Sequence, residues 1–380
     1  SNAADFTVGS DDVTLTLSQD GSDIESVTTD SNGDYVFSAQ DDGDYTLTVT
    51  APNHQSATQT GVTIDSGNTT EDFALDGNVT NTDTGTTYVS IQSAVDGAST
   101  GDRITAAPGT YAESVTIAVD NLTLESTGTA SETTISTNSG PAIRIDGSNG
   151  GSTGVAIDGF SLEAGTSDNN VLNTYGMSDL TVRNASLTPL NDATGGMYSD
   201  GVVTLDNVAF QSSSGTKTGV FLDGSGGSTI TNTQVDGWGN GMQIQSEYDV
   251  TIQNSGIQNN AYTGVNVPAT ADVSPLTITN SEIVNNPGST AINIYDDDGD
   301  GSVTGTADAE RNWWGSANGP GQDGANGVTG PVDVEPWLDS ADGSAVPYEL
   351  SATALDPSPG TNGQVATYGL NVTVDQIGPE

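Results

Sequence analysis

One short motif recurs along the chain at nearly constant spacing, and it constrains the fold more than any other feature. Its copies begin at residues 155, 180, 203, 228, 250 and 276 and read "VAIDGFSL", "LTVRNASL", "VTLDNVAF", "STITNTQV", "VTIQNSGI" and "LTITNSEI". Successive copies therefore start 25, 23, 25, 22 and 26 residues apart. A period in this range is typical of a stacked repeat architecture.

Each repeat predicts one coil of a parallel solenoid. A second apolar stretch precedes each motif, as in "GVFLDG" before "STITNTQV", so a coil holds two or three short strands that stack on the next coil at ~4.8 Å. Strand alternation places Val250, Ile252 and Ile257 inside the solenoid. The asparagine between the strands forms a corner, and its copies should superpose in a ladder of hydrogen-bonded amides: Asn184, Asn207, Asn232, Asn254 and Asn280.

The outward position before this asparagine reads Asp158, Arg183 and Asp206 in three successive copies. Arg183 should therefore lie between two carboxylates, one on each neighbouring coil. We interpret it as a partner in a structural ion pair rather than as a catalytic arginine.

The charge balance restricts the classes of partner. The chain has 51 acidic residues against five Lys and Arg, a net charge of −46, and no cysteine. Nucleic acid and anionic membranes require clustered Lys or Arg, so neither is expected as a partner. At ~1 M salt the Debye length falls to ~3 Å, and we interpret the acidity as adaptation of a halophilic protein, with a calcium-binding polyanion as the alternative. No stretch approaches the ~18 apolar residues of a membrane span.

Residues 4–77 alternate apolar and polar side chains between "DSNG" and "DDG" turns, which predicts a small antiparallel β-sandwich. The stretch "TTDSNGDYVFSAQDDGDYTLTVTA" resembles the carboxypeptidase regulatory-like domain, an Ig-like module. The resemblance implies a spacer or attachment role and no catalysis.

The character of the chain changes at Tyr88. Ile91, Ala94, Val95 and Ala98 share one face of a short helix, with Ser90 as its N-cap. Together with "GDRI" and "PGTY", this segment resembles the start of right-handed parallel β-helix proteins of the pectin-lyase-like superfamily. The resemblance implies a β-helix over residues 78–339, with a helical cap at 88–117 that plugs the first coil and coils at 118–300.

The phrase "RNWWGSANGP", followed by "EPWL", resembles the terminal segment of NosD-like β-helix repeat proteins. It implies a C-terminal cap over residues 301–339, in which Trp313, Trp314 and Trp337 cover the last coil. Residues 340–380 contain two strand-like stretches, "YELSATALD" and "LNVTVD", and we expect them to begin a further β module that the sequence truncates.

The strand preceding each motif offers the candidate binding surface. Its outward positions combine aromatic side chains with carboxylates and amides, which suits sugars because their CH faces stack on rings and their hydroxyls accept and donate hydrogen bonds. The resembled superfamily uses this side of the helix for polysaccharides. The candidate carbohydrate-binding residues are Arg144, Tyr175, Tyr198, Phe221, Gln243 and Gln245.

Catalysis on the same face has three candidate residues. Asp200 and Asp223 lie one coil apart, at a separation of ~5 Å that permits acid, base or nucleophile roles, and Lys217 is the single lysine. The alternative is that each aspartate before glycine only closes a turn, and that the lysine is solvated. The Gly-His-Gly, Arg-Ile-Lys and Asp-Phe-Ile-Phe-Gly patterns of enzymes in the superfamily are absent, and the only histidine is His54.

The segment "DDDGDGS" is a candidate calcium loop. Asp296, Asp298 and Asp300 are spaced as alternate ligands before Gly301, but position 12 is Ala307 instead of Glu, so the segment is not an EF-hand. Ca²⁺ is the only cofactor candidate in the sequence.

The sequence thus predicts an all-β protein with an Ig-like sandwich followed by a right-handed single-stranded parallel β-helix. Its expected function is that of a secreted or cell-surface structural or adhesion module, with a polysaccharide or cell-surface glycan as partner. A polysaccharide lyase or glycoside hydrolase and a pure spacer are the two alternatives, and short turns that wall no cleft disfavour the enzyme.

Overall fold

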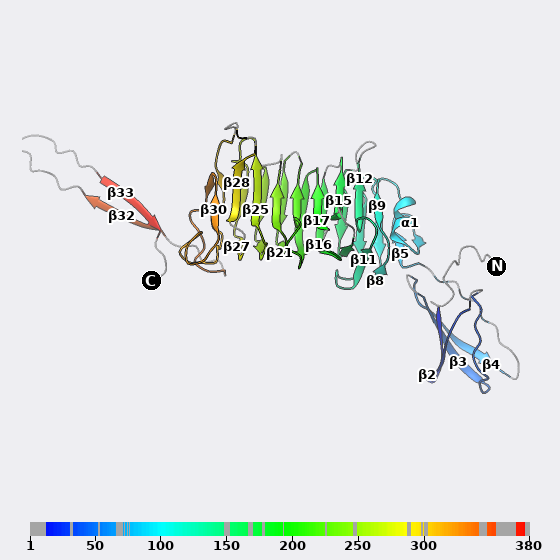
Figure 1. Cartoon of the computed structure of the whole chain (residues 1–380). Coiled ribbons are helices and arrows are strands. Elements are labelled where there is room, and N and C mark those ends of the chain that lie inside the picture. Colours follow the sequence, from blue (N-terminus) through cyan, green and yellow to red (C-terminus); the bar gives the residue numbers. More distant parts are fainter. Residues whose placement is uncertain are drawn as a thin grey trace, which may run out of the picture.

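The computed structural model of the chain is all-β apart from one short helix. It describes residues 13–30, 33–51, 54–65, 71, 73, 75, 77–147, 153–165, 170–176, 179–192, 194–224, 226–245, 249–286, 290–297, 299, 303–341, 348–354 and 370–376. Figure 1 shows stacked strands extending from α1 at one end to β30 at the other.

The N-terminal unit is one antiparallel sheet of four strands in the order β2-β1-β3-β4. Alternation buries one face, including Leu15, Leu47 and Val49, and Phe37 and Phe73 pack against that face. Among its described residues, this unit shows a single sheet with a covered face where a two-sheet sandwich was predicted. The strands are β1 (Thr14–Gln19), β2 (Ser22–Thr28), β3 (Gly43–Thr50) and β4 (Ala57–Ile64).

The predicted solenoid is confirmed, and one of its two sheets has nine strands. All nine pair in parallel, one per coil. They are β9 (Val115–Ile117), β12 (Ile143–Asp146), β15 (Asn170–Tyr175), β17 (Gly195–Ser199), β19 (Val220–Leu222), β22 (Asn240–Ile244), β25 (Thr263–Ala269), β28 (Thr290–Asp296) and β30 (Gly327–Thr329).

The second sheet has eighteen strands and contains the recurring motif. Its first strands are β5 (Val79–Asn81), β6 (Thr86–Tyr88), β7 (Arg103–Ala106), β8 (Gly109–Tyr111), β10 (Thr123–Ser126), β11 (Thr133–Thr137), β13 (Ala156–Asp158), β14 (Ser161–Ala164) and β16 (Leu180–Pro189). The others are β18 (Val203–Gln211), β20 (Ser228–Thr231), β21 (Gln234–Asp236), β23 (Val250–Gln253), β24 (Gly256–Gln258), β26 (Thr277–Thr279), β27 (Glu282–Val284), β29 (Ala307–Asp308) and β31 (Val332–Asp333).

The motif folds as predicted. Ile230, Ile252 and Ile278 are in register on successive coils and each is at most 1% exposed. The five corner asparagines all adopt left-handed backbone, with φ between 48° and 56°. Asparagine tolerates this conformation better than most residues because its short side chain bonds locally.

The amide ladder is only partly as predicted, because aspartates take some of the bonds. Asn207 Nδ2 donates to Asn184 Oδ1 at 2.8 Å, but Asn184 donates to Asp158 and Asn232 donates to Asp206, each at 2.8 Å. The predicted ion pair of Arg183 is wrong. Register places Arg183 between Asp158 and Asp206, yet it belongs to neither ion pair found among the described residues, since the amides already occupy those carboxylates.

The predicted helix is α1 (Ile91–Asp96), and the Ser90 side chain accepts from the Ser93 N–H. The Glu113 carboxylate, which was not predicted as a cap, accepts from the N–H groups of Ile91 and Gln92 at 2.8 and 2.9 Å. The helix does not protect the first strand edge as expected. Strand β5 pairs antiparallel with β7 and occupies that edge, while α1 adds buried side chains to the core.

At the other end of the solenoid, Trp314 is fully buried in the core and Trp337 packs against it. The Trp337 Nε1–H donates to the Ala317 carbonyl oxygen at 3.0 Å. Beyond this end, β32 (Tyr348–Ala354) and β33 (Leu370–Gln376) form the predicted strands and pair antiparallel.

A column of glycines lets successive coils approach closely at the start of the nine-strand sheet. Gly196, Gly219, Gly241 and Gly264 stand in successive coils, and a Cβ on any of them would lie 2.2 to 2.7 Å from a carbonyl oxygen of the next coil. The next member of the column is Ala291, which lies where the register between β28 and β30 shifts. No residue of β30 is paired with Ala291, so the alanine side chain does not meet a residue directly opposite it on the next coil.

Candidate functional site

The outer face of the nine-strand sheet has the predicted alternation. Arg144, Tyr198, Phe221 and Gln243 all point outward, while the residues beside them, such as Met197 and Val220, are buried. The register aligns one outward column over seven coils: Arg144, Asn173, Tyr198, Phe221, Gln243, Asn266 and Asn293. Asn173 departs from the expected exposure, since it is only 1% exposed, and its Oδ1 accepts from Asn170 Nδ2 at 2.8 Å.

Three aromatic rings form one cluster on this face. The ring centroids of Tyr175 and Tyr198 are 5.7 Å apart with a 35° tilt, and those of Tyr198 and Phe221 are 5.4 Å apart and perpendicular. The Arg144 guanidinium carbon lies 5.1 Å from the Tyr175 ring centroid, within the range of a cation–π contact. We call Tyr175, Tyr198 and Phe221 the aromatic cluster.

The two candidate carboxylates lie beside the cluster on adjacent coils. Asp223 N–H donates to the Ser199 carbonyl oxygen, which places Asp223 next to Asp200 in the sheet. Asp200 Oδ2 accepts from the Gly176 N–H at 2.7 Å, and Tyr198 Oη donates to Asp223 Oδ2 at 3.5 Å. The other Asp200 oxygen, Oδ1, is buried and has no hydrogen-bond partner. Burial raises the pKa of Tyr198, and the negative charges of Asp223 and Asp200 raise it further.

The structure separates Lys217 from these carboxylates. Lys217 lies in the loop before β19, where its carbonyl oxygen accepts from the Gly239 N–H at 2.6 Å. Asp223 directly follows β19. The lysine and the aspartates therefore lie beyond opposite ends of the strands, and the structure does not bring the three catalytic candidates together.

Amide side chains continue the face beyond Phe221. Gln243 Nε2 donates to Gln245 Oε1 at 3.2 Å, and Asn293 Nδ2 donates to Asn266 Oδ1 at 3.0 Å. Each of these amides keeps further donor or acceptor capacity for a ligand. The predicted polar surroundings of the aromatic cluster are therefore present.

Only part of the candidate calcium loop lies among the described residues. Asp296 Oδ1 accepts from the Gly299 N–H at 2.8 Å, which is a local turn contact. Asp298 and Asp300 lie outside the described residues. Within the described part of the chain, no group of three or more His, Cys, Asp or Glu side chains is arranged to hold a metal ion.

Two protein-family models match the chain, one over the N-terminal sheet and one over the solenoid. The carboxypeptidase regulatory-like domain matches residues 10–76, and the right-handed β-helix region matches residues 151–307. The part of the chain from 151 to 307 is therefore a right-handed β-helix region. A carboxypeptidase regulatory-like domain precedes this region.

Similar solved structures include a pectin methylesterase mutant in complex with a hexasaccharide, with 13% identity over 70% of this chain and 82% of that chain and a TM-score of 0.33. An alginate lyase from Paenibacillus sp. str. FPU-7 has 14% identity over 64% of this chain and 96% of its own, with a TM-score of 0.35. The Dettilon tailspike protein has 11% identity over 71% and 69%, with a TM-score of 0.33. No curated protein matches the chain. No helix among the described residues is long and apolar enough to cross a membrane.

Proposed function

We propose that the protein is an extracellular or cell-surface structural module that binds carbohydrate on the outer face of its nine-strand sheet. The observation that carries this proposal is the aromatic cluster. Its three rings come from three successive coils, and Tyr175 is 38% exposed. Rings with an accessible apolar surface, beside amides and carboxylates that exchange hydrogen bonds, match the alternating CH and hydroxyl surfaces of a sugar chain.

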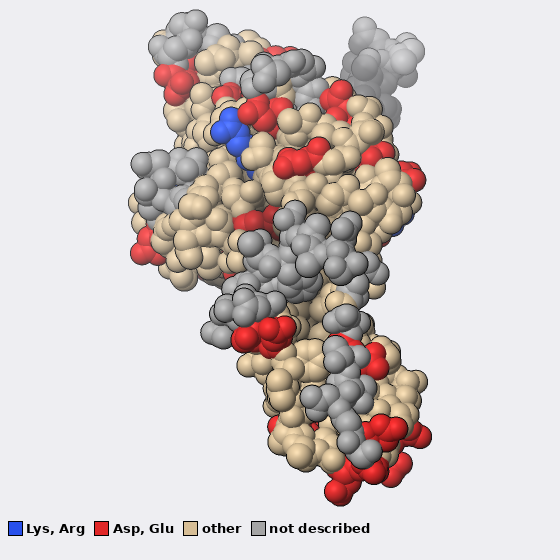
Figure 2. All heavy atoms as spheres, turned by 90° about the vertical axis from the view of Figure 1, so that its right-hand side faces the viewer, with Lys and Arg blue, Asp and Glu red and all other residues tan. Residues whose placement is uncertain are grey.

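The charge of the protein restricts the classes of glycan that it can bind. At a net charge of −46, long-range repulsion opposes uronate and sulfated polymers unless salt screens it, and screening is strong only when the Debye length falls to ~3 Å near 1 M salt. Figure 2 shows acidic side chains scattered over the end of the molecule that it views, with few basic ones. The proposed partner is therefore a neutral glycan, or an acidic one in concentrated salt, and nucleic acid remains excluded from the proposal.

Cleavage of the bound polysaccharide is the second candidate function. It is favoured by the buried Asp200 Oδ1, which has no hydrogen-bond partner and lies one coil from Asp223. A pair of adjacent carboxylates is the arrangement that glycoside hydrolases use. Against it, Asp200 Oδ2 already accepts from the Gly176 backbone, as expected of a residue that closes a turn.

The test is retention on a panel of immobilised polysaccharides in ~1 M NaCl with Ca²⁺, with new reducing and unsaturated ends measured in parallel. The Tyr198→Ala/Phe221→Ala double variant should weaken retention at least ten-fold, about 1.4 kcal/mol. Tyr262→Ala is the matched control, because Tyr262 is 54% exposed outside the aromatic cluster, and it should bind as the wild type does.

Retention without cleavage, lost in the double variant alone, supports the binding module. Cleavage that Asp200→Asn or Asp223→Asn abolishes would replace it with the enzyme. No retention of any polysaccharide would leave the β-helix as a spacer and refute both.

A further inference from the structure

A groove follows the asparagine corner of the eighteen-strand sheet, away from the aromatic cluster. It has two stretches, of about 700 and 260 Å³, and Gln234 lines both of them. The groove begins at Glu125 and ends beside Trp313. We call it the corner groove.

The two stretches of the corner groove follow one another along the axis of the β-helix. Its lining comes from seven coils that pair in parallel, from the coil of Glu125 to that of Asn280. Six steps of ~4.8 Å between them give a length of about 29 Å. A site of this shape suits a linear chain that lies along the axis of the β-helix rather than a compact ligand.

On the floor of the groove, small side chains lie on both sides of Gln234. Ser186, Ala209, Gln234 and Gly256 stand in one column on successive coils. The Gln234 amide lies over Gly256, because a Cβ at position 256 would be 2.1 Å from Gln234 Oε1. Glycine at this position therefore lets the Gln234 side chain lie across the middle of the groove, where its amide faces both stretches.

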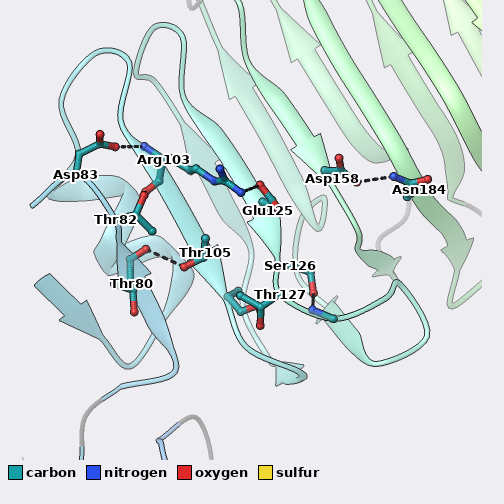
Figure 3. Close-up of polar contacts among 12 residues, drawn as sticks. Thr80, Thr82, Asp83, Arg103, Thr105, Glu125, Ser126, Thr127, Asp158 and Asn184 are labelled. Atoms are coloured by element: carbon teal, nitrogen blue, oxygen red, sulfur yellow. Dashed lines mark hydrogen bonds and ion pairs between the residues drawn. The ribbon is translucent and has the colours of Figure 1, made fainter. Parts of the chain in front are cut away.

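Three of the four arginines of the chain border this groove. Figure 3 shows Arg103 paired with Glu125 and, one coil further along, Asp158 bonded to Asn184. Arg183 is in register between Asp158 and Asp206, and Arg311 Nε donates to Asn280 Oδ1 at 3.2 Å. Four acidic residues, Glu125, Asp158, Asp206 and Glu282, line or border the same groove, so its charge is far less one-sided than that of the whole chain, which has five Lys and Arg and a net charge of −46.

The hydrogen-bonding groups of the groove are mostly neutral amides and hydroxyls. Asn207 and Asn232 each donate one bond along the ladder, and a primary amide has two N–H donors and two lone pairs, so each keeps free capacity. The column of Ser186, Ala209 and Gly256 offers no large apolar side chain on the floor. Half-buried Trp313 offers one apolar surface at the far end.

We propose that the corner groove binds an uncharged linear glycan along the axis of the β-helix, with the Gln234 amide as a central contact. Hydroxyl groups pair with neutral amides without the desolvation cost of a charge, and the net charge of −46 repels polyanions. This second site is independent of the aromatic cluster, which lies on the other sheet.

The test is isothermal titration of the full chain with four uncharged hexasaccharides, those of β-1,4-glucose, β-1,4-xylose, β-1,4-mannose and β-1,3-glucose, in molar NaCl. In the Tyr198→Ala/Phe221→Ala background, which removes the aromatic cluster as a second binding site, Ala209→Trp fills the floor of the groove and should weaken binding at least ten-fold, and Gln234→Ala should weaken it several-fold. Gln211→Trp is the matched control, because Gln211 is exposed on the same face of β18 but outside the groove, and its affinity should be unchanged. Circular dichroism confirms that each variant is folded.

The Tyr198→Ala/Phe221→Ala variant separates the two sites and should retain this binding. If the double variant loses hexasaccharide binding and Ala209→Trp keeps it, the corner groove is not a glycan site while the aromatic-cluster proposal stands. Unchanged affinity when Ala209→Trp is added to the double variant, or no binding of any of the four hexasaccharides, overturns the corner-groove proposal.

Discussion

Gly219→Ala is expected to destabilise the β-helix by about 1–2 kcal/mol. A Cβ at this position would lie 2.7 Å from the Gly241 carbonyl oxygen, 2.7 Å from Val235 Cγ1 and 3.0 Å from Trp238 Cδ1. Overpacking a close-packed interior costs about 1–3 kcal/mol. The smaller entropy of the unfolded alanine chain offsets about 0.4–1 kcal/mol of that cost.

Urea unfolding in molar NaCl, followed by tryptophan fluorescence, measures this effect. All four tryptophans lie between residues 238 and 337 of the β-helix, so the signal does not depend on the N-terminal domain. Gly327→Ala is the matched control, because its Cβ would have only the Gly321 Cα, at 4.0 Å, for a neighbour, and its stability should be unchanged or up to about 1 kcal/mol higher. Equal urea midpoints for Gly219→Ala and the wild type would show that the coils do not approach as closely as the structure has them.

Two further predictions concern pH and salt. Burial, and to a smaller extent the charge of Glu113, raises the pKa of Tyr111 to about 12 from an ordinary value of 10.0. Folding therefore favours the neutral phenol. The stability that this preference contributes is complete below pH 10 and is lost as the pH rises through 12. Urea midpoints measured from pH 9 to 12 should therefore fall less steeply in Tyr111→Phe than in the wild type. The described residues form only two ion pairs, and the net charge is −46, so repulsion between carboxylates should destabilise the fold at low salt. The urea midpoint should therefore rise between ~0.1 and ~1 M NaCl, because salt screens this repulsion. A midpoint independent of salt would contradict the interpretation of the acidity as adaptation to a high-salt medium.

The repeat predicted the solenoid because its period and alternation follow from backbone geometry alone. A strand buries every second side chain whatever its neighbours are, so the inward positions of Val250, Ile252 and Ile257 could be assigned from the motif and are fully buried. The corner could also be assigned from the local sequence, because few residues other than glycine and asparagine adopt left-handed backbone at low cost.

Contacts between coils were less predictable, because several side chains compete for each partner. Arg183 was expected to pair with Asp158, but the nearer Asn184 amide takes that carboxylate. Asn173 lies at an outward position and is nevertheless buried under Asn170. Pattern alone places a side chain on a face and does not say which neighbour covers it.

The corner groove was missed although its signal was present. Small residues stand two positions after three of the five corner asparagines, as Ser186, Ala209 and Gly256 show, while Gln234 and Glu282 follow the other two. The aromatic residues that mark a sugar-binding surface lie instead on the strand before each motif. Combining the glycine and serine positions with the stacking of coils would have predicted a concave surface there.

A crystal structure of the protein with an oligosaccharide of the best-retained polysaccharide, in molar salt, tests the central claim most directly. The account predicts sugar rings across β15, β17 and β19, in contact with Tyr198 and Phe221, and an intact glycan chain. Sugar bound elsewhere with the aromatic cluster bare, or a chain cleaved beside Asp200 and Asp223, would contradict it.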